Sequence, residues 1–310
     1  MHRRNPQAQY PYESNTTSIK ENEKMSWNTK ITGFADEIAP DLKTQVESFH
    51  RLGISHIEMR GVDGNNLIYH NDAKVREIKN YLDGNGITLS ALGSPLGKIG
   101  ITDDFAPHFQ DFQRAVEIAH MMDTPYIRMF SFYLPAGSTP EEYEGPVFDR
   151  ISKLVEYAGS QEVVLLHENE KGIYGEKAAE CKKLMNEFYG TSFRCIFDFA
   201  NYIQAGEDTL EAYHLLKPYI SYIHVKDALK ENGKVVPAGM GDGMLPEILS
   251  DLHQSGYQGF LSLEPHLFQF TGLSELEKTE HKSLVDAKPL SGFEAFSLAH
   301  SSLMHILNEL

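Results

Sequence analysis

Cysteine is scarce in this chain of 310 residues, which contains only Cys181 and Cys195. Cys195 lies inside the apolar segment "FRCIF", where a reduced, packed thiol is expected rather than half of a disulfide bond. This cysteine usage fits a reducing compartment. We therefore expect a cytoplasmic protein.

Basic residues are also few, with 28 Lys and Arg against 44 Asp and Glu, and the formal net charge is -16. The field of such a protein repels the phosphates of nucleic acids and the head groups of anionic lipids. Long apolar runs are missing too, since none approaches the roughly 18 to 20 residues that cross a bilayer. The N-terminus lacks the apolar core of a signal peptide. We expect a soluble protein with no nucleic-acid or membrane partner.

Hydrophobic periodicity is missing from residues 1–29, which are polar and mixed in charge. Such a segment buries too little surface to offset the entropy lost on folding, so we expect a disordered leader. Met25 is a candidate for the start of the chain alongside Met1. Residues 30–310 contain no evident linker and are expected to form a single domain.

Short β-rich segments alternate with amphipathic, helix-like segments from Ile31 onward. Several helix-like segments are closed by a glycine, such as Gly53 or Gly256, which is a common helix stop. This alternation favours a parallel sheet, and eight units over about 280 residues suit a (β/α)8 TIM barrel. The segments predicted to be strands are 30–36, 54–60, 87–93, 125–131, 162–168, 193–198, 221–226 and 260–264.

An open, doubly wound sheet is the alternative fold for such a pattern. Sheets of that kind often bind nucleotides through glycine-rich motifs. No GxGxxG follows the first predicted strand, and no GxxxxGK[ST] occurs in the chain. The barrel is therefore preferred.

Four successive predicted strands end in ionisable residues. Glu168 ends "VVLLHE", Asp198 ends "FRCIFD", His224 lies near the end of "SYIHVK", and Glu264 ends "FLSLE". A single acidic residue at a strand end is more often a helix cap or a solvated loop residue. In a TIM barrel, however, the C-terminal ends of the strands meet on the catalytic face. Four such residues in phase indicate one shared site.

The composition of this group indicates a metal. Three carboxylates around one point repel one another unless a cation neutralises them. Carboxylate oxygens with one imidazole suit Mn²⁺, Mg²⁺, Co²⁺ or Zn²⁺ rather than a closed thiolate site. We therefore expect one divalent ion as the cofactor.

The segments "IEMR", "HENE", "FDFAN", "IHVKD" and "LEPH" resemble the xylose isomerase-like superfamily of sugar isomerases and epimerases. The resemblance extends from about Ile31 to the C-terminus. It implies the same TIM barrel and the same metal ligands, namely Glu168, Asp198, His224 and Glu264. Endonuclease IV is a distant branch of this superfamily, and the acidic charge of the chain disfavours its DNA substrate.

Two residues depart from the pattern of the epimerases in this superfamily. Asn201 and Glu170 stand where histidines are common. Both positions lie beside the predicted ligands rather than among them. The departures therefore concern the substrate and leave the metal site intact.

Other polar residues surround the predicted ligands. The basic ones could bind substrate oxygens or pair with neighbouring carboxylates. Glu58 could hydrogen bond to substrate or to Arg60, and His266 could contact substrate hydroxyls or be a solvated loop residue. Asp227 is expected to support the ligands from behind, and His167 to face the helices. The candidate substrate-binding residues are Glu58, Arg60, Arg128, Asn201, Lys226 and His266.

Two segments after these strands are expected to be functional loops. Residues 226–243 are rich in glycine and follow the predicted metal ligand His224. Residues 266–293 are long for a connection in this fold, where two to six residues are usual, and contain Phe268 and Phe270. Loops of this length form lids or subunit interfaces, which leaves a homo-oligomer open.

The resemblance and the residues together predict a metal-dependent isomerase or epimerase that acts on a small keto-sugar or related polyol carbonyl. Glu168 and Glu264 are the expected acid and base for proton transfer through an enediolate. A dehydratase of the inosose type could use the same residues, because loss of water can follow the same proton abstraction. A non-catalytic barrel that binds a sugar as a sensor is the alternative of another class.

Overall fold

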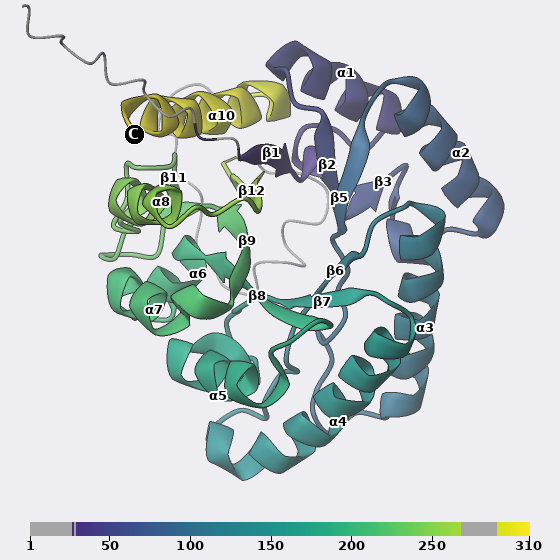
Figure 1. The fold of residues 1–310 in the computed structure, drawn as a ribbon, viewed down its shortest axis with the longest axis vertical. Coiled ribbons are helices and arrows are strands. Elements are labelled where there is room, and N and C mark those ends of the chain that lie inside the picture. Colours follow the sequence, from purple (N-terminus) through teal and green to yellow (C-terminus); the bar gives the residue numbers. More distant parts are fainter. Residues whose placement is uncertain (1–26, 28, 268–289) are drawn as a thin grey trace, which may run out of the picture.

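The computed structural model describes residues 27, 29–267 and 290–310 of the chain. In this part, eight parallel strands surround a barrel axis (Figure 1). The strands are β1 (Lys30–Gly33), β2 (His56–Met59), β5 (Thr88–Leu92), β6 (Tyr126–Met129), β7 (Val164–His167), β8 (Phe193–Asp198), β9 (Ile220–Val225) and β12 (Phe260–Leu263). Their order in the sheet is β1-β12-β9-β8-β7-β6-β5-β2.

The two edge strands, β1 and β2, meet where the sheet curves back on itself. A parallel bridge between Phe34 and Glu58 joins the chain at their ends. The barrel is therefore nearly closed, and the predicted (β/α)8 TIM barrel is confirmed.

Helices cover the outside of the barrel (Figure 1). The α-helices are α1 (Leu42–Leu52), α2 (Asp72–Gly84), α3 (Phe105–Met121), α4 (Pro140–Ser160), α5 (Ala178–Phe188), α6 (Phe199–Gln204), α7 (Thr209–Leu216), α8 (Leu245–Gln254) and α10 (Gly292–Glu309). The 3-10 helices are η1 (Ala35–Glu37), η2 (Leu67–Tyr69), η3 (Tyr174–Glu176) and η4 (Lys217–Tyr219). The short strands β3 (Gly61–Val62), β4 (Asn65–Asn66), β10 (Asp227–Ala228) and β11 (Val235–Val236) form two small hairpins. In the part of the chain that the structure describes, no helix is long and apolar enough to cross a membrane.

Helix α1 shows how the local sequence sets the ends of these elements. The Asp41 side chain accepts a hydrogen bond from the backbone N–H of Thr44 and so caps the first turn. Gly53 follows the last turn with φ of +71°, a left-handed conformation that glycine adopts without strain. The glycine expected to stop this helix does so.

Alternating residues on several strands enter two separate apolar clusters. On β8, Cys195 and Phe197 pack in the outer cluster against the helices, whereas Ile196 packs in an inner cluster with Tyr222 of β9. The period of two puts Asp198 on the same inward face as Ile196. The phase of the strand therefore aims this carboxylate into the barrel.

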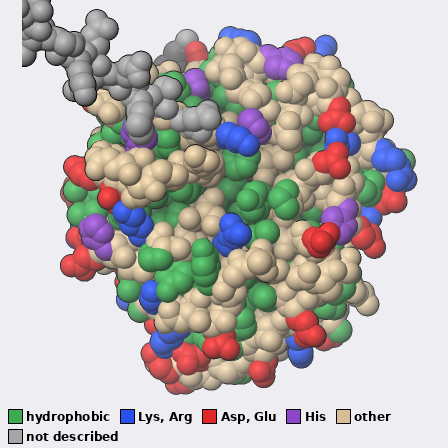
Figure 2. All heavy atoms as spheres, in the orientation of Figure 1, with side chains coloured by type: hydrophobic (Ala, Val, Ile, Leu, Met, Phe, Trp, Pro, Cys, Tyr) green, Lys and Arg blue, Asp and Glu red, His purple; other side chains and the backbone are tan. Residues whose placement is uncertain are grey.

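One face of the molecule, viewed along the barrel, shows how the residue types are distributed at the surface. Acidic side chains lie mainly around its rim, and hydrophobic side chains reach toward its middle (Figure 2). The large negative charge of the chain is thus mostly solvated, except for the carboxylates buried inside the barrel.

The end of the predicted leader contacts the barrel. Trp27 donates a hydrogen bond from Nε1 to the Tyr257 carbonyl at 2.9 Å, and its ring stacks on His253 with centroids 5.2 Å apart. Thr29 Oγ1 donates to the Gly259 carbonyl at 2.8 Å. These residues were expected to be disordered, and their anchoring comes from partners about 230 residues away that local sequence does not reveal.

Gly97 lets the loop after β5 pack against the segment after β6. Its φ is +87°, and an added Cβ would collide with the carbonyl oxygen of Phe130. The backbone N–H of Phe130 donates to Leu96 at 2.7 Å, and that of Phe132 donates to Gly97 at 3.0 Å. The N–H of Gly97 donates to His108 Nε2 at 2.9 Å. Burial lowers the pKa of His108 to about 4, which keeps this nitrogen available as an acceptor.

We expect Gly97→Ala to destabilise the protein more than Gly64→Ala. Both glycines have φ of +87°, but an added Cβ at Gly64 meets no atom within 4 Å. The control should lose about 1 to 2 kcal/mol for the left-handed backbone, and Gly97→Ala roughly 1 to 3 kcal/mol more for overpacking. Urea denaturation measures both losses. Equal losses would contradict the close packing of the two loops.

Candidate metal centre

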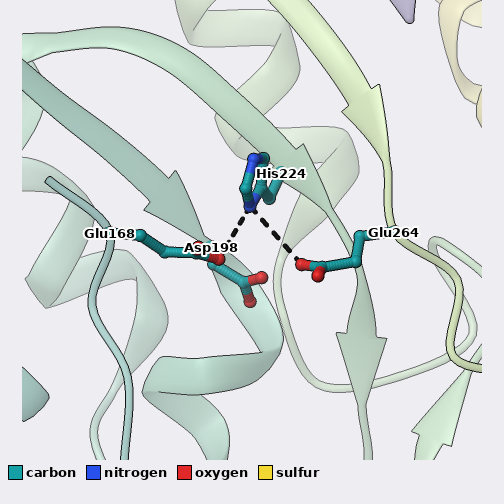
Figure 3. Close-up of side chains that lie close together, drawn as sticks. All are labelled: Glu168, Asp198, His224 and Glu264. Carbon is teal, nitrogen blue, oxygen red and sulfur yellow. Dashed lines mark hydrogen bonds and ion pairs between the residues drawn. The ribbon is translucent and has the colours of Figure 1, made fainter. Parts of the chain in front are cut away.

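Four strands of the barrel bring one ionisable side chain each to a common point. Asp198 is the last residue of β8 and His224 lies in β9, whereas Glu168 and Glu264 directly follow β7 and β12. One donor atom from each lies within 4.8 Å of the others, and all four side chains are buried. The four point toward one another (Figure 3).

His224 lies at the centre of this group. Its Nδ1 is 2.7 Å from Glu168 Oε1 and 3.4 Å from Glu264 Oε2. The two carboxylates approach this same nitrogen, one from the left and one from the right in Figure 3. The Nε2 atom is directed instead at Glu58, at 3.2 Å from Oε2.

The charge of each residue in this group depends on its neighbours. Burial opposes a charged imidazolium, but the adjacent Glu168 and Glu58 carboxylates outweigh it and raise the pKa of His224 well above its ordinary value. Burial also raises the pKa of Asp198, to about 6, although Lys226 opposes the shift. Burial acts in the same direction on Glu168, but His224 and Arg128 prevail and lower its pKa to about 2. Without a metal, protons and basic side chains therefore neutralise the site.

The four residues fit a divalent ion. Three carboxylates and one imidazole form a donor set that Mn²⁺, Mg²⁺, Co²⁺ and Zn²⁺ accept. Asp198 Oδ2 is buried and accepts no hydrogen bond from the residues described, and its charged neighbour is Lys226 Nζ at 3.1 Å. A cation among the four carboxyl and imidazole groups would satisfy this oxygen and relieve their repulsion. The cluster could thus hold a metal.

The three basic residues predicted around the site each pair with one of its carboxylates. Arg128 Nη1 lies 3.2 Å from Glu168 Oε2, and Arg60 Nη1 lies 3.0 Å from Glu264 Oε1. Lys226 Nζ lies 3.4 Å from Glu264 Oε2, in addition to its contact with Asp198. Pairing with carboxylates, one of the two alternatives for these residues, is what the structure shows. Contact with a substrate stays a prediction.

Two acidic residues that the sequence analysis missed extend the network around Arg60. The carboxylate of Asp36 accepts from Arg60 Nε at 2.8 Å, and Glu37 Oε1 lies 3.5 Å from Nη2. Burial raises the pKa of Glu37 to about 7, although His266 and Arg60 oppose the shift. Both acids follow β1 in "GFADE", the same position relative to a strand that identified the predicted metal ligands. That signal could have found them.

His266 is buried rather than solvated. Its backbone N–H donates to Glu37 Oε2 at 2.8 Å, and its Nε2 lies 3.6 Å from Glu37 Oε1 and 3.5 Å from Glu264 Oε1. These three residues also bring donor atoms within 4.8 Å of one another. The Arg60 guanidinium already lies beside this second group. The positive charge beside Glu37, Glu264 and His266 is therefore that of the Arg60 side chain.

Phe34 is a further residue that the sequence analysis missed. Its ring centroid lies 4.5 Å from the Arg60 guanidinium carbon and 4.8 Å from that of Arg128. The ring also meets the edge of His224 at a centroid distance of 5.3 Å. The aromatic face thus stabilises two guanidinium groups beside the cluster.

Glu58 and Asn201, two of the candidate substrate-binding residues, have partners within the protein, and their contact with a substrate stays a prediction. Glu58 is fully buried, and its carboxylate contacts His224 and Ser262 instead of Arg60. Asn201 donates from Nδ2 to the Asn169 carbonyl at 2.7 Å. Strand β2 carries Glu58 inside the barrel, and Asn201 belongs to the first turn of α6.

Asp227 organises the glycine-rich segment 226–243. Its carboxylate accepts hydrogen bonds from the backbone N–H groups of Gly239 and Gly241 on Oδ2, and of Gly243 and Ala228 on Oδ1. One buried side chain therefore fixes the loop that follows Lys226. Its expected supporting role behind the ligands stays a prediction.

The second predicted loop, 266–293, lies mostly outside the described residues. Residues 268–289, including Phe268 and Phe270, belong to the part that the structure does not describe.

Glu170, the other departure from the epimerase pattern, pairs with Lys98, whose Nζ lies 2.8 Å from Glu170 Oε2.

The fold and the cluster define a TIM barrel protein with a candidate metal centre at the C-terminal ends of its strands. The chain belongs to the xylose isomerase-like TIM barrel family, whose family model matches residues 46–282. The resemblance inferred from the strand-end motifs is therefore confirmed.

Two curated relatives align with the chain. The 3-dehydroshikimate dehydratase of Bacillus anthracis is 20% identical over 236 residues, covering 71% of this chain and 83% of the relative. The uncharacterized protein YihM of Escherichia coli is 37% identical over 82 residues, which cover 24% of this chain. The alignment spans 25% of the length of YihM, so this likeness concerns a segment.

Solved structures share the fold at low sequence identity. The probable dehydratase AsbF of Bacillus anthracis has a TM-score of 0.69 and 16% identity, covering 91% of this chain and 100% of its own. The IolI protein, solved with a bound zinc atom, has a TM-score of 0.69 and 17% identity, with coverages of 91% and 99%. The 3-keto-D-glucoside 4-epimerase YcjR of E. coli has a TM-score of 0.65 and 14% identity, with coverages of 90% and 99%.

We expect a divalent ion to bind this centre more tightly as the pH rises from about 6 to about 8. The raised pKa of His224 means that the imidazole is protonated at neutral pH without metal, and the ion must displace a proton. Asp198, with a pKa of about 6, adds a competing proton at lower pH. Calorimetric titration with Zn²⁺ in two buffers of different ionisation enthalpy should show release of about one proton at pH 7. Binding that is independent of pH would contradict this charge arrangement.

Proposed function

We propose that the protein is a divalent-metal-dependent isomerase or epimerase of a small keto-sugar or related polyol carbonyl compound. The observation that carries the proposal is the matched environment of Glu168 and Glu264. Each directs one carboxylate oxygen toward His224 and has the other held by an arginine, Arg128 or Arg60. Two carboxylates on opposite sides of one site can serve as the base that removes a proton from carbon and the acid that returns one.

The metal site would consist of Glu168, Asp198, His224 and Glu264. A bound divalent ion supplies Lewis-acid stabilisation of negative charge on a substrate oxygen. Asp198 and His224 act only as ligands, because neither is placed symmetrically about the site as the two glutamates are. Glu168 and Glu264 exchange the roles of base and acid according to the direction of the reaction.

The residues around the glutamates then bind and orient the substrate. Arg60, Arg128 and Lys226 are buried donors that can bind carbonyl and hydroxyl oxygens while keeping the carboxylates ionised. His266 is placed beside Glu264 and offers a further contact to a hydroxyl. The burial of these groups excludes bulk water, which strengthens each electrostatic interaction with the developing enediolate.

The neighbours with the same fold support this class of reaction. They include the 3-keto-D-glucoside 4-epimerase YcjR and a D-psicose 3-epimerase, and the IolI structure contains zinc. The proposal extends to a cytoplasmic carbohydrate enzyme that uses manganese or zinc, and the zinc atom in the IolI structure supports the choice of zinc. A sugar-binding sensor barrel, the alternative of another class, would not need two of the ligands to be carboxylates in matched environments.

A dehydratase is the second candidate function. The alignment that covers most of the chain is with a 3-dehydroshikimate dehydratase. The same base would remove the proton next to a carbonyl, and the opposite glutamate would protonate the departing hydroxyl rather than carbon. The two reactions differ only in the fate of the enediolate.

We expect the metal-loaded enzyme in D₂O to place deuterium on the carbon next to the carbonyl of a ketose that it binds. Glu168→Gln and Glu264→Gln should each reduce this exchange by roughly 10² to 10⁴-fold, because the proton acceptor is lost. Proton NMR of a panel of ketoses, inososes and hydroxypyruvate measures the exchange. Loss of water in the same spectra would identify the dehydratase.

The control is Glu144→Gln, which removes an ion pair with Lys183 on the outer helices. This variant should exchange at the wild-type rate. If the metal-loaded wild type neither exchanges deuterium nor releases water from any compound of the panel, the proposed reaction is wrong and the binding-protein alternative replaces it.

A further inference from the structure

Glu58 lies on the side of His224 that is opposite the metal cluster. Its carboxylate is fully buried, and Oε2 lies 3.2 Å from His224 Nε2. Ser262 Oγ donates to the same oxygen at 2.6 Å. The other ring nitrogen, Nδ1, faces Glu168 and Glu264. The imidazole therefore lies between the Glu58 carboxylate, at its Nε2 atom, and the cluster, at its Nδ1 atom.

The pairing of the strands directs Glu58 into this position. In the ladder between β2 and β5, the register shifts between Ile57 and Glu58, so that Ile57 pairs with Leu89 and Glu58 with Ala91. Such irregularities redirect a side chain locally. Glu58 also takes part in the parallel bridge with Phe34 where the barrel closes. The carboxylate is thus held at the point where β1 and β2 meet.

The partners of the Glu58 carboxylate are an imidazole and hydroxyl groups. Within the described part of the chain, the ion pair of Glu58 is with His224. A buried carboxylate without such a partner is costly. The other polar neighbours of Glu58 are hydroxyls, since Ser262 Oγ donates to Oε2 at 2.6 Å and the Tyr222 hydroxyl lies beside the carboxylate. The acceptor of the Nε2 proton is therefore Glu58.

We infer that Glu58 is a positioning residue that holds the proton of His224 on Nε2 and so presents the Nδ1 lone pair to the metal. The inference rests on the proposed metal site. A neutral imidazole has one donor and one acceptor nitrogen, so fixing the donor at Nε2 fixes the acceptor at Nδ1. Carboxylates commonly orient metal-bound histidines in this way. Glu58 then acts on the metal through His224 and does not contact substrate.

Two substitutions separate the hydrogen bond from the charge. Glu58→Asp keeps the negative charge but shortens the side chain by about 1.5 Å, so the bond to Nε2 is lost. Glu58→Gln removes the charge but keeps an oxygen that can accept the bond. We expect Glu58→Asp to weaken Zn²⁺ binding by roughly 10- to 100-fold and Glu58→Gln to weaken it less. Competition with a chromophoric chelator measures both affinities.

The opposite order of the two affinities would overturn the inference in favour of a simple charge effect. Wild-type affinity in Glu58→Asp would overturn it as well. Ser90→Ala is the control, because Ser90 belongs to the same buried polar layer but has no contact with His224 among its hydrogen bonds. This variant should bind Zn²⁺ like the wild type.

Nitrogen-15 NMR of the histidine rings tests the wild type even if a variant does not fold. With Zn²⁺ bound, His224 should carry its proton on Nε2 and the metal on Nδ1, with assignment by loss of the signal in His224→Ala. Metal on Nε2 would overturn the inference.

The proposed function fails in a different way. If Asp198→Asn binds Zn²⁺ as tightly as the wild type, the ligand set itself is wrong, whatever the Glu58 variants do. If the metal binds as expected but no substrate exchanges deuterium, the reaction is wrong while the role of Glu58 stands.

Discussion

The repulsion between three buried carboxylates is the interaction on which the rest of this structure depends. Glu168, Asp198 and Glu264 bring their oxygens within 4.8 Å of one another and of an imidazole inside the barrel. Like charges at such separations in a region of low dielectric constant are compatible with folding only beside compensating cations. Arg60, Arg128 and Lys226 provide these cations. The need to compensate the three carboxylates therefore explains why three basic side chains are buried beside them.

Two layers hold the charged groups in place. Beside the cluster, the ring of Phe34 contacts both arginines and the edge of His224, so one aromatic residue limits the movement of three charged ones. Beneath the cluster, Glu58 and Ser262 form a polar contact in the barrel interior. Rigid strands carry both layers, which suits a site whose chemistry needs accurately placed groups.

The chemistry proposed for this site does not by itself select one reaction. Abstraction of a proton next to a carbonyl leads to an isomer, an epimer or a dehydrated product, depending on which atom is protonated next. That choice belongs to residues around the cluster. Glu170 pairs with Lys98, and the amide of Asn201 is bound to the backbone of Asn169. At the two positions where the epimerase pattern was expected to have histidines, this chain has an ion pair and an amide bound to the backbone.

The sequence by itself determined the barrel and the phase of its strands. Alternating segments specified eight strands, and the period of two placed Glu168, Asp198, His224 and Glu264 on the inward face where the strands end. Only the tertiary structure decided the partners of these residues. Arg60 meets Glu264 across 204 residues of chain, and Glu58 meets Ser262 across the same separation. Both contacts form because β1 and β2 close the barrel against β12, and the register at this closure is a property of the folded sheet rather than of any local segment.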